Sequence, residues 1–323
     1  MRDLRTSFFQ DEGTTLAVDG VSFDVLPGRA LGIVGESGCG KSVTAHSILR
    51  IVQPPGRIVA GEIVLTRADG SQVDLVKLKP NGRLVRAIRG GDIGLVFQEP
   101  MTSFSPVHTV GAQIVEAVLL HNAVSRKEAR HRGIEALRSV GIPNPERRID
   151  EYSFELSGGL RQRAMIAVAL SCAPRLLIAD EPTTALDVTT QAQILELLRT
   201  LQRERGMAIM LITHNLGVVA EMADDVVVMY LGKVVEQGSV DDIFHDPKHP
   251  YTKALLRSIP SIESKPRVKL PTIAGSIPHP FNRPTGCPFH PRCESFQPGR
   301  CDTAEPALTP VGEGRKASCF LYP

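Results

Sequence analysis

The chain has 323 residues with 37 Lys+Arg against 35 Asp+Glu, a balance that argues against a polyanion, and hence against nucleic acid, as a partner. It contains no run of about 18 uncharged apolar residues, so no transmembrane helix is predicted. The first residues lack the apolar run of a signal peptide, which favours a cytoplasmic location. Six cysteines are too few for a disulfide scaffold in a chain of this length.

Apolar runs that alternate with helical patterns predict an α/β fold, a parallel sheet covered by helices. Each run is apolar along its whole length, as expected for strands buried on both faces. The five predicted strands lie at residues 30–34, 93–97, 176–179, 208–213 and 226–229. A helix is predicted at 42–51, and the pattern becomes helical between about 107 and 155. There Ser125 and Glu128 form a capping-box pattern that opens a helix through Val140.

Proline divides the chain into two parts. Fourteen of the 24 prolines fall within residues 246–323. This density argues against long helices and predicts a loop-rich C-terminal extension. We therefore expect a main domain at 1–245 and an extension at 246–323.

A phosphate-binding loop is predicted between the first buried strand and the helix that follows it. The motif is G-x-x-x-x-G-K-S, formed by Gly35-Glu36-Ser37-Gly38-Cys39-Gly40-Lys41-Ser42. Its glycines let backbone amides surround phosphates, and the helix N-terminus adds partial positive charge. Lys41 is expected to reach the β- and γ-phosphate oxygens, and the Ser42 hydroxyl to ligate Mg²⁺. Cys39 is interpreted as a passive loop residue.

Two carboxylates end the predicted strand at 176–179. Asp180 is expected to hold the Mg²⁺ shell and Glu181 to act as the general base for the attacking water. Two further polar residues end neighbouring strands. Gln98 could touch Mg²⁺ and sense the γ-phosphate, and His214 could contact that phosphate and orient the water.

A second glycine motif, Leu156-Ser157-Gly158-Gly159, opens a basic helix 116 residues after Lys41. A helix-capping turn is the simpler interpretation of this motif alone. In order and spacing, however, all these motifs resemble those of ABC ATPases over about residues 1–240. One departure is Leu160, where many members of that family carry Gln.

This resemblance implies a P-loop NTPase ABC cassette, with a RecA-like mixed sheet core and a helical subdomain at about 107–165. It also implies that two cassettes pack head to tail. Ser157 and the amides of Gly158 and Gly159 would then clasp the γ-phosphate on the second ATPase subunit's P-loop, and Asp187 would cross the interface. The second subunit could be identical or homologous.

Three stretches resemble the ATPase subunits of bacterial oligopeptide and dipeptide importers. They lie at residues 97–103, 179–189 and 249–252. The resemblance implies a subunit that binds ATP and Mg²⁺ and powers peptide import from the cytoplasmic face of the inner membrane. Its partners would be two transmembrane permease subunits, a second ATPase and an extracytoplasmic binding protein. Tyr152 and Glu155, just before the signature, are candidates for transmitting motion to the channel, with simple packing as the alternative.

Other functions within the same family stay open. Related importers carry oligosaccharides, nickel or opines. Soluble ABC ATPases that act on ribosomes usually hold two cassettes, and those that act on DNA insert long coiled coils, for which the 116-residue gap leaves no room. An exporter is disfavoured by the importer-like tail.

Phe8 is the predicted adenine-stacking residue, with Phe9 as the alternative. Stacking requires only an aromatic face, so the chemistry fits either ring. Either phenylalanine could equally belong to the core.

Four cysteines in the proline-rich tail predict a metal centre. Cys287, Cys293, Cys301 and Cys319 follow a C-x5-C-x7-C-x17-C spacing, which lacks the C-x2-C pairs of ordinary zinc sites. Four thiolates could hold a [4Fe–4S] cluster, and the tail resembles the cluster-bearing end of the peptide-importer ATPases. Zinc and free or oxidised thiols are the alternatives. His290 could be a further ligand, although a surface role fits it better.

Overall fold

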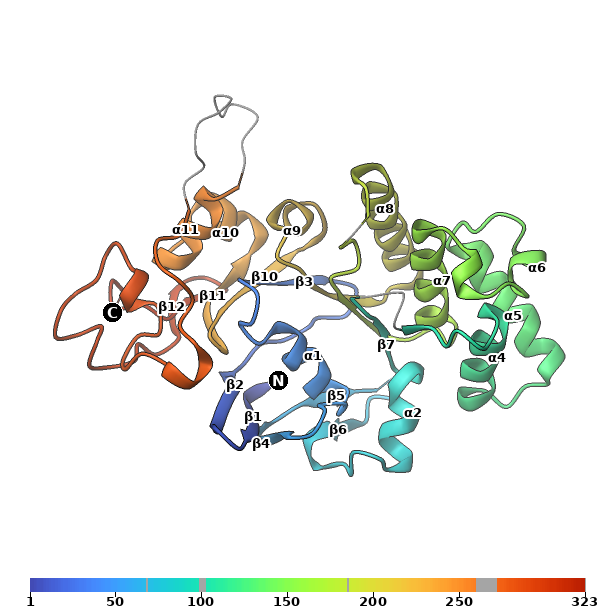
Figure 1. The fold of residues 1–323 in the computed structure, drawn as a ribbon, viewed down its shortest axis with the longest axis horizontal. Coiled ribbons are helices and arrows are strands. Elements are labelled where there is room, and N and C mark those ends of the chain that lie inside the picture. Colours follow the sequence, from blue (N-terminus) through green and yellow to red (C-terminus); the bar gives the residue numbers. More distant parts are fainter. Residues whose placement is uncertain (68, 99–102, 185, 260–271, 323) are drawn as a thin grey trace.

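A twisted eight-stranded sheet crosses the centre of the computed structural model, which describes residues 1–67, 69–98, 103–184, 186–259 and 272–322 (Figure 1). Five adjacent strands of this sheet are parallel, in the order β10-β3-β9-β8-β7. Their bounds are β3 Ala30–Val34, β7 Ile93–Val96, β8 Leu176–Asp180, β9 Ala208–Ile212 and β10 Asp225–Tyr230. All five strands predicted from apolar runs are thus confirmed, with ends that differ by at most one residue.

The central strands are apolar throughout because helices cover both faces of the sheet. Every residue of β3 and of β9 is buried, as expected for parallel strands between helical layers. Helices α1 Lys41–Ile48, α8 Val188–Arg205 and α9 Leu216–Met222 follow β3, β8 and β9, and α2 Arg83–Gly91 precedes β7. Helix α1 ends three residues earlier than the sequence pattern predicts.

A three-stranded antiparallel sheet packs beside the first helix, in the order β2-β1-β4. Its strands, with the small hairpin and short helix that follow, are β1 Arg2–Gln10, β2 Gly13–Val21, β4 Gly56–Glu62, β5 Val64–Thr66, β6 Gln72–Asp74 and η1 Leu75–Lys77. This sheet brings Ala17 of β2 against the beginning of α1. An ideal Cβ on Gly40 would lie 2.3 Å from the Ala17 carbonyl oxygen.

A group of helices lies at the far end of the sheet from the C-terminal segment (Figure 1). These helices are α4 Val110–His121, α5 Arg126–Ser139, α6 Pro145–Arg148, η2 Ser153–Glu155 and α7 Gly158–Leu170. The predicted cap of α5 forms, since the Ser125 side chain accepts a hydrogen bond from the Glu128 backbone amide. Helices α4, α5 and α7 share one apolar core with the β7–β9 part of the sheet.

The segment after His245 joins the main sheet. Two elements precede this segment, β11 Lys233–Ser239 and α10 Val240–His245. The segment itself contains α11 Pro250–Arg257, η3 Pro280–Asn282, η4 His290–Arg292, β12 Thr309–Gly312 and β13 Arg315–Ala317. Strand β13 pairs with β11, and β12 forms the outer edge. Tyr251 and Phe289 are buried in the same apolar cluster as Val34 and Tyr230, so this segment shares a core with the preceding domain.

A network around Asp19 ties the C-terminal segment to β2. This buried carboxylate lies 3.0 Å from Arg283, 2.9 Å from Lys233 and 2.9 Å from Arg5. Burial raises the pKa of Asp19, but the three cations outweigh this effect and leave the pKa below its usual value.

Within the described residues, the helices that the fold contains are too short or too polar to cross a membrane.

Candidate functional site

The predicted nucleotide-binding residues meet at the carboxyl edge of the parallel strands. The P-loop follows β3, Asp180 and Glu181 end β8, and His214 comes two residues after β9. Gln98 comes two residues after β7 and is exposed. Because these four strands are parallel and adjacent, their ends lie along one edge, which is where α/β sheets bind ligands.

The P-loop has a backbone shape that only glycine adopts easily. Gly35 has φ +151° and Gly40 has φ +97°, and a Cβ on Gly35 would come within 2.2 Å of the Met229 carbonyl oxygen. Ser37 and Gly38 are exposed at the turn, whereas Cys39 and Lys41 are buried. The Lys41 Nζ donates to the carbonyl oxygens of Gly35 (2.6 Å) and Glu36 (3.1 Å).

The fourth variable residue of the loop, Cys39, has a thiol that burial makes less acidic. Its pKa is raised above the ordinary value by loss of solvent. This environment agrees with the interpretation of Cys39 as a passive loop residue.

The site offers Mg²⁺ the oxygen ligands that it prefers. Asp180 is buried, its Oδ1 has no hydrogen-bond partner, and Ser42 bonds to its side chain. Burial raises the pKa of Asp180 above the usual value, although Ser42 opposes the shift. An orphaned buried carboxylate oxygen beside the P-loop hydroxyl fits a cation, since a buried charge is otherwise costly. Gln98, the third predicted ligand, lies on the same edge.

Glu181 is held by two neighbours. The His214 Nδ1 lies 2.9 Å from its Oε1, and the Thr184 hydroxyl donates to its Oε2 at 2.7 Å. Burial raises the pKa of Glu181, but these hydrogen bonds outweigh burial, so the pKa lies below its ordinary value. The backbone of Glu181 has φ +48°, a strained conformation for a side chain that is not glycine. The carboxylate is thus fixed and ionised beside His214, as a base requires.

The predicted signature caps helix α7. The Ser157 side chain accepts from the Leu160 amide, and Ser157 and Gly158 are both exposed. A Cβ on Gly158 would meet nothing within 4 Å, whereas one on Gly159 would lie 2.9 Å from Thr190. The capping turn and a partner-binding surface are therefore compatible, because the N-terminal amides of α7 face outward.

Asp187 also caps a helix. Its carboxylate accepts from the Thr190 amide (2.9 Å) and hydroxyl (2.7 Å) at the start of α8, which lowers its pKa. This contact accounts for Asp187 within one chain, and its predicted place at a dimer interface stays a prediction.

The two phenylalanines predicted to stack on adenine lie on β1. The Phe8 ring packs against Gly56, so closely that a Cβ added to this glycine would lie 2.6 Å from the ring. Phe9 is 38% exposed, and the Arg57 guanidinium lies 4.1 Å from its ring centroid. The neighbouring strand β2 contacts the P-loop through Ala17. The assignment of Phe8 to adenine stays a prediction.

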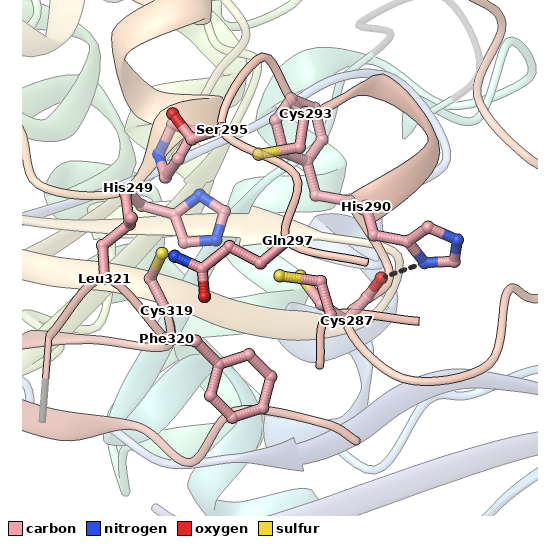
Figure 2. A pocket seen from close by; sticks show the side chains of 12 residues that line it. His249, Cys287, His290, Cys293, Ser295, Gln297, Cys319, Phe320 and Leu321 are labelled. Carbon is pink, nitrogen blue, oxygen red and sulfur yellow. Dashed lines mark hydrogen bonds between the residues drawn. The ribbon is translucent and has the colours of Figure 1, made fainter. Parts of the chain in front are cut away.

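The four tail cysteines line one cavity of about 330 Å³, measured with its mouth (Figure 2). All four thiols are free, and burial raises the pKa of Cys287 to about 11. His290 turns its ring away from the sulfurs in Figure 2, and its Nδ1 lies 3.0 Å from the Cys287 carbonyl oxygen. This orientation favours the surface role for His290.

The four thiols stay a predicted metal site rather than an observed one. In the part of the chain that the structure describes, no three His, Cys, Asp or Glu side chains converge closely enough to ligate one metal ion. A zinc ion would require four sulfurs at about 2.3 Å from one point. A [4Fe–4S] cluster takes one thiolate at each iron, and the cluster and zinc both stay predictions.

Sequence reasoning missed the C-terminal residues that touch the P-loop. The Tyr251 hydroxyl accepts a hydrogen bond from the Glu36 amide at 2.9 Å. Arg292 donates to both Glu36 carboxylate oxygens, at 2.8 and 3.0 Å. Glu36, predicted as part of the nucleotide site, therefore directs its side chain to the extension. Two features of the sequence could have pointed to these residues. Tyr251 lies in the importer-like stretch at 249–252, and Arg292 lies beside Cys293.

Comparisons with known proteins agree with this fold. The ABC transporter family profile matches residues 18–184, and the profile of the oligopeptide/dipeptide transporter C-terminal region matches residues 235–301. This chain belongs to the ABC transporter family.

Named relatives lie in the same group. The chain is 49% identical to the oligopeptide transport ATP-binding protein AppD of Bacillus subtilis, over 100% of this chain and 96% of the relative. It is 46% identical to the dipeptide transport ATP-binding protein DppD of Escherichia coli, over 98% of this chain and 94% of the relative. Among solved structures, the dimeric bacterial ABC transporter cassette MJ0796 matches with a TM-score of 0.64 and 26% identity, covering 74% of this chain and 97% of that one.

Proposed function

We propose that this chain is the ATP-hydrolysing subunit of an importer for oligopeptides or dipeptides. The observation that carries the proposal is the convergence of the P-loop, Asp180, Glu181 and His214 at one sheet edge. The match of the C-terminal region to oligopeptide/dipeptide transporters supports the substrate class.

The residues divide the work of hydrolysis. The P-loop amides and Lys41 bind the phosphates, while Ser42 and Asp180 would hold Mg²⁺, which neutralises phosphate charge when bound. Glu181 takes a proton from the attacking water, and its lowered pKa keeps it ready to do so. His214 holds Glu181 in place and would contact the γ-phosphate. Ser157, Gly158 and Gly159 complete the site of a second ATPase subunit.

Coupling to peptide import is tested by reconstituting the chain with the membrane proteins encoded beside it. The complex is reconstituted into lipid vesicles together with its binding protein. We then expect an oligopeptide or dipeptide to stimulate ATP turnover. Oligosaccharide and nickel serve as the comparison substrates. Stimulation by one of these and not by peptides would overturn the substrate class.

An exposed apolar patch supports docking to the channel. The stacked rings of Tyr152 and Phe154 have centroids 5.3 Å apart, and Phe154 is 60% exposed. A bridge between Thr109 and Tyr152 brings Val107, 74% exposed, toward the same place. The Glu155 carboxylate accepts from the Tyr152 amide at 2.7 Å and fixes the turn. This patch would receive the two permease subunits, which places the chain at the cytoplasmic face of the bacterial inner membrane.

The docking proposal is tested by co-purification. We expect Phe154→Asp to lose the permease subunits from an affinity-purified complex. Leu26→Asp changes another exposed apolar residue, outside the patch, and should retain them. Equal retention by both variants would overturn the assignment of the patch.

The four tail thiols would hold a [4Fe–4S] cluster. When bound, the cluster would cross-link distant segments of the extension and so stabilise it. Anaerobically purified protein is then expected to be brown, with about four irons per chain. Cys319→Ser should lose the iron, whereas Cys172→Ser, which changes a thiol outside the cavity, should keep it. Colourless protein with one zinc would assign the site to zinc, and metal-free protein would defeat both assignments.

A further inference from the structure

The loop between the first two tail cysteines reaches the phosphate-binding loop. Short helix η4 ends this loop and carries Arg292 next to Cys293. The guanidinium forms a two-pronged ion pair with Glu36, the second residue of the P-loop. The Arg292 side chain is 4% exposed, so water screens this pair little.

Two further hydrogen bonds hold the Arg292 side chain in place. Its Nε donates to the Ala274 carbonyl oxygen at 3.0 Å, and an Nη donates to the Tyr230 hydroxyl at 3.3 Å. Phe289, from the same cysteine loop, packs at 5.3 Å from both the Tyr230 and Tyr251 rings. The loop is therefore anchored to the sheet before it contacts Glu36.

Glu36 is held at two points by residues of the C-terminal segment. Arg292 binds its carboxylate, and Tyr251 accepts from its backbone amide. A free carboxylate within a phosphate-binding loop would repel the nucleotide. The ion pair neutralises that charge and directs it away from the loop interior, where the amides must face the phosphates.

We propose that Arg292 is a positioning residue for ATP binding, so that the loop between Cys287 and Cys293 controls the nucleotide affinity of the P-loop. The inference rests on the proposed function of the chain as an ATPase. Arg292 acts through Glu36, and the four-cysteine site and the nucleotide site are thermodynamically linked. If the two sites are linked in this way, we expect ATP binding to alter the accessibility of the tail thiols.

The first test compares two arginines of the full-length chain. For Arg292→Gln we expect ATP binding, measured with a fluorescent ATP analogue, to weaken about tenfold, within the usual range of linked sites. The kcat should change less than about twofold, because Glu181 and His214 are untouched. The matched control is Arg257→Gln. Arg257 pairs with Glu294, the residue after Cys293, at 3.0 Å but contacts no P-loop residue, so ATP affinity should not change.

A double variant separates charge neutralisation from simple loss of packing. With Glu36→Gln already present, adding Arg292→Gln should weaken ATP binding far less than it does in the wild-type background. Arg292→Lys keeps the charge without the two-pronged geometry and should fall between wild type and Arg292→Gln. Folded Arg292→Gln protein that binds ATP as tightly as wild type would overturn the proposal.

A measurement on the wild-type protein keeps the proposal falsifiable if the Arg292 variants fail to fold. In wild-type protein freed of bound metal, the rates of alkylation by iodoacetamide at Cys287 and Cys293 are followed by peptide mass spectrometry, which scores the P-loop Cys39 separately. We expect a non-hydrolysable ATP analogue to slow alkylation of the two tail cysteines several-fold, and unchanged rates would refute the linkage. The binding and alkylation measurements do not require ATP hydrolysis. A chain that binds ATP but does not cleave it would therefore refute the ATPase assignment and leave the role of Arg292 in ATP binding to be judged by these measurements.

Discussion

Glu181→Gln replaces the proposed base with an amide of the same shape. In the wild-type chain the two carboxylate oxygens accept from His214 and Thr184, at 2.9 and 2.7 Å. The amide oxygen can keep one of these contacts, and the strained backbone at this residue is unchanged. What the variant loses is a group that can accept a proton at neutral pH.

The expected loss follows from the role of a general base. Such a group contributes about 10² to 10⁴ in rate, so we expect kcat to fall by about 10³, equivalent to about 4 kcal/mol of transition-state stabilisation. ATP affinity should stay within about threefold of wild type, because Lys41 and the P-loop amides are untouched. An ATP-bound dimer should accumulate if, as proposed, ATP holds two subunits together until it is cleaved.

Steady-state phosphate release measures the turnover, and size-exclusion chromatography with ATP measures the dimer. Glu196→Gln, an exposed position on α8, is the matched control and should behave as wild type. Turnover within about twofold of wild type in Glu181→Gln would refute the assignment of the base.

Four further substitutions test the geometry of the chain. Gly40→Ala would place a Cβ 2.3 Å from the Ala17 carbonyl oxygen at φ +97° and should destabilise the protein by about 2 kcal/mol or more. In Gly38→Ala the added Cβ would meet nothing within 4 Å, so this variant should lose only about 1 kcal/mol of stability. Thermal melts without nucleotide compare the two variants. Asp19→Asn should lower stability by about 3 kcal/mol at neutral pH. Folding lowers the pKa of Asp19 below 3.8, so its stabilising effect is complete above that value and is lost as the pH falls through the folded pKa. The denaturation curves of variant and wild type should therefore converge once the pH lies below the folded pKa. Ser157→Arg should cost about 1 kcal/mol in helix capping yet abolish ATP-dependent dimers on size-exclusion chromatography; a normal dimer would exclude the signature from the interface.

The sequence predicted the parallel strands and the nucleotide site because both leave local signals. A strand buried on both faces is apolar throughout, as in β3, and a P-loop requires glycine at fixed intervals. The antiparallel sheet of β1, β2 and β4 was not predicted. Its strands are only partly buried, as β1 shows with exposed residues at both ends, so their apolar pattern is weak.

The contacts of the C-terminal segment could not be predicted from local patterns. Arg292 and Glu36 lie 256 positions apart in the sequence, and neither belongs to a motif that requires the other. Strand β12 contains Pro310 and Gly312, two residues that disfavour strands, so only its pairing with β13 identifies it. The proline-rich composition correctly predicted short elements, but it carried no information about which surface they would cover.

The pairing of β13 with β11 predicts how a truncated chain would behave. A protein ending near His245 would leave the β11 edge without its neighbour and would uncover apolar side chains such as Tyr230, now 1% exposed. An open edge beside exposed apolar surface invites strand addition from other copies. Premature termination near His245 should therefore yield aggregates rather than a smaller working ATPase. The short outer strand β12, with its Pro310, in turn gives the intact sheet an edge that is poor at recruiting another chain.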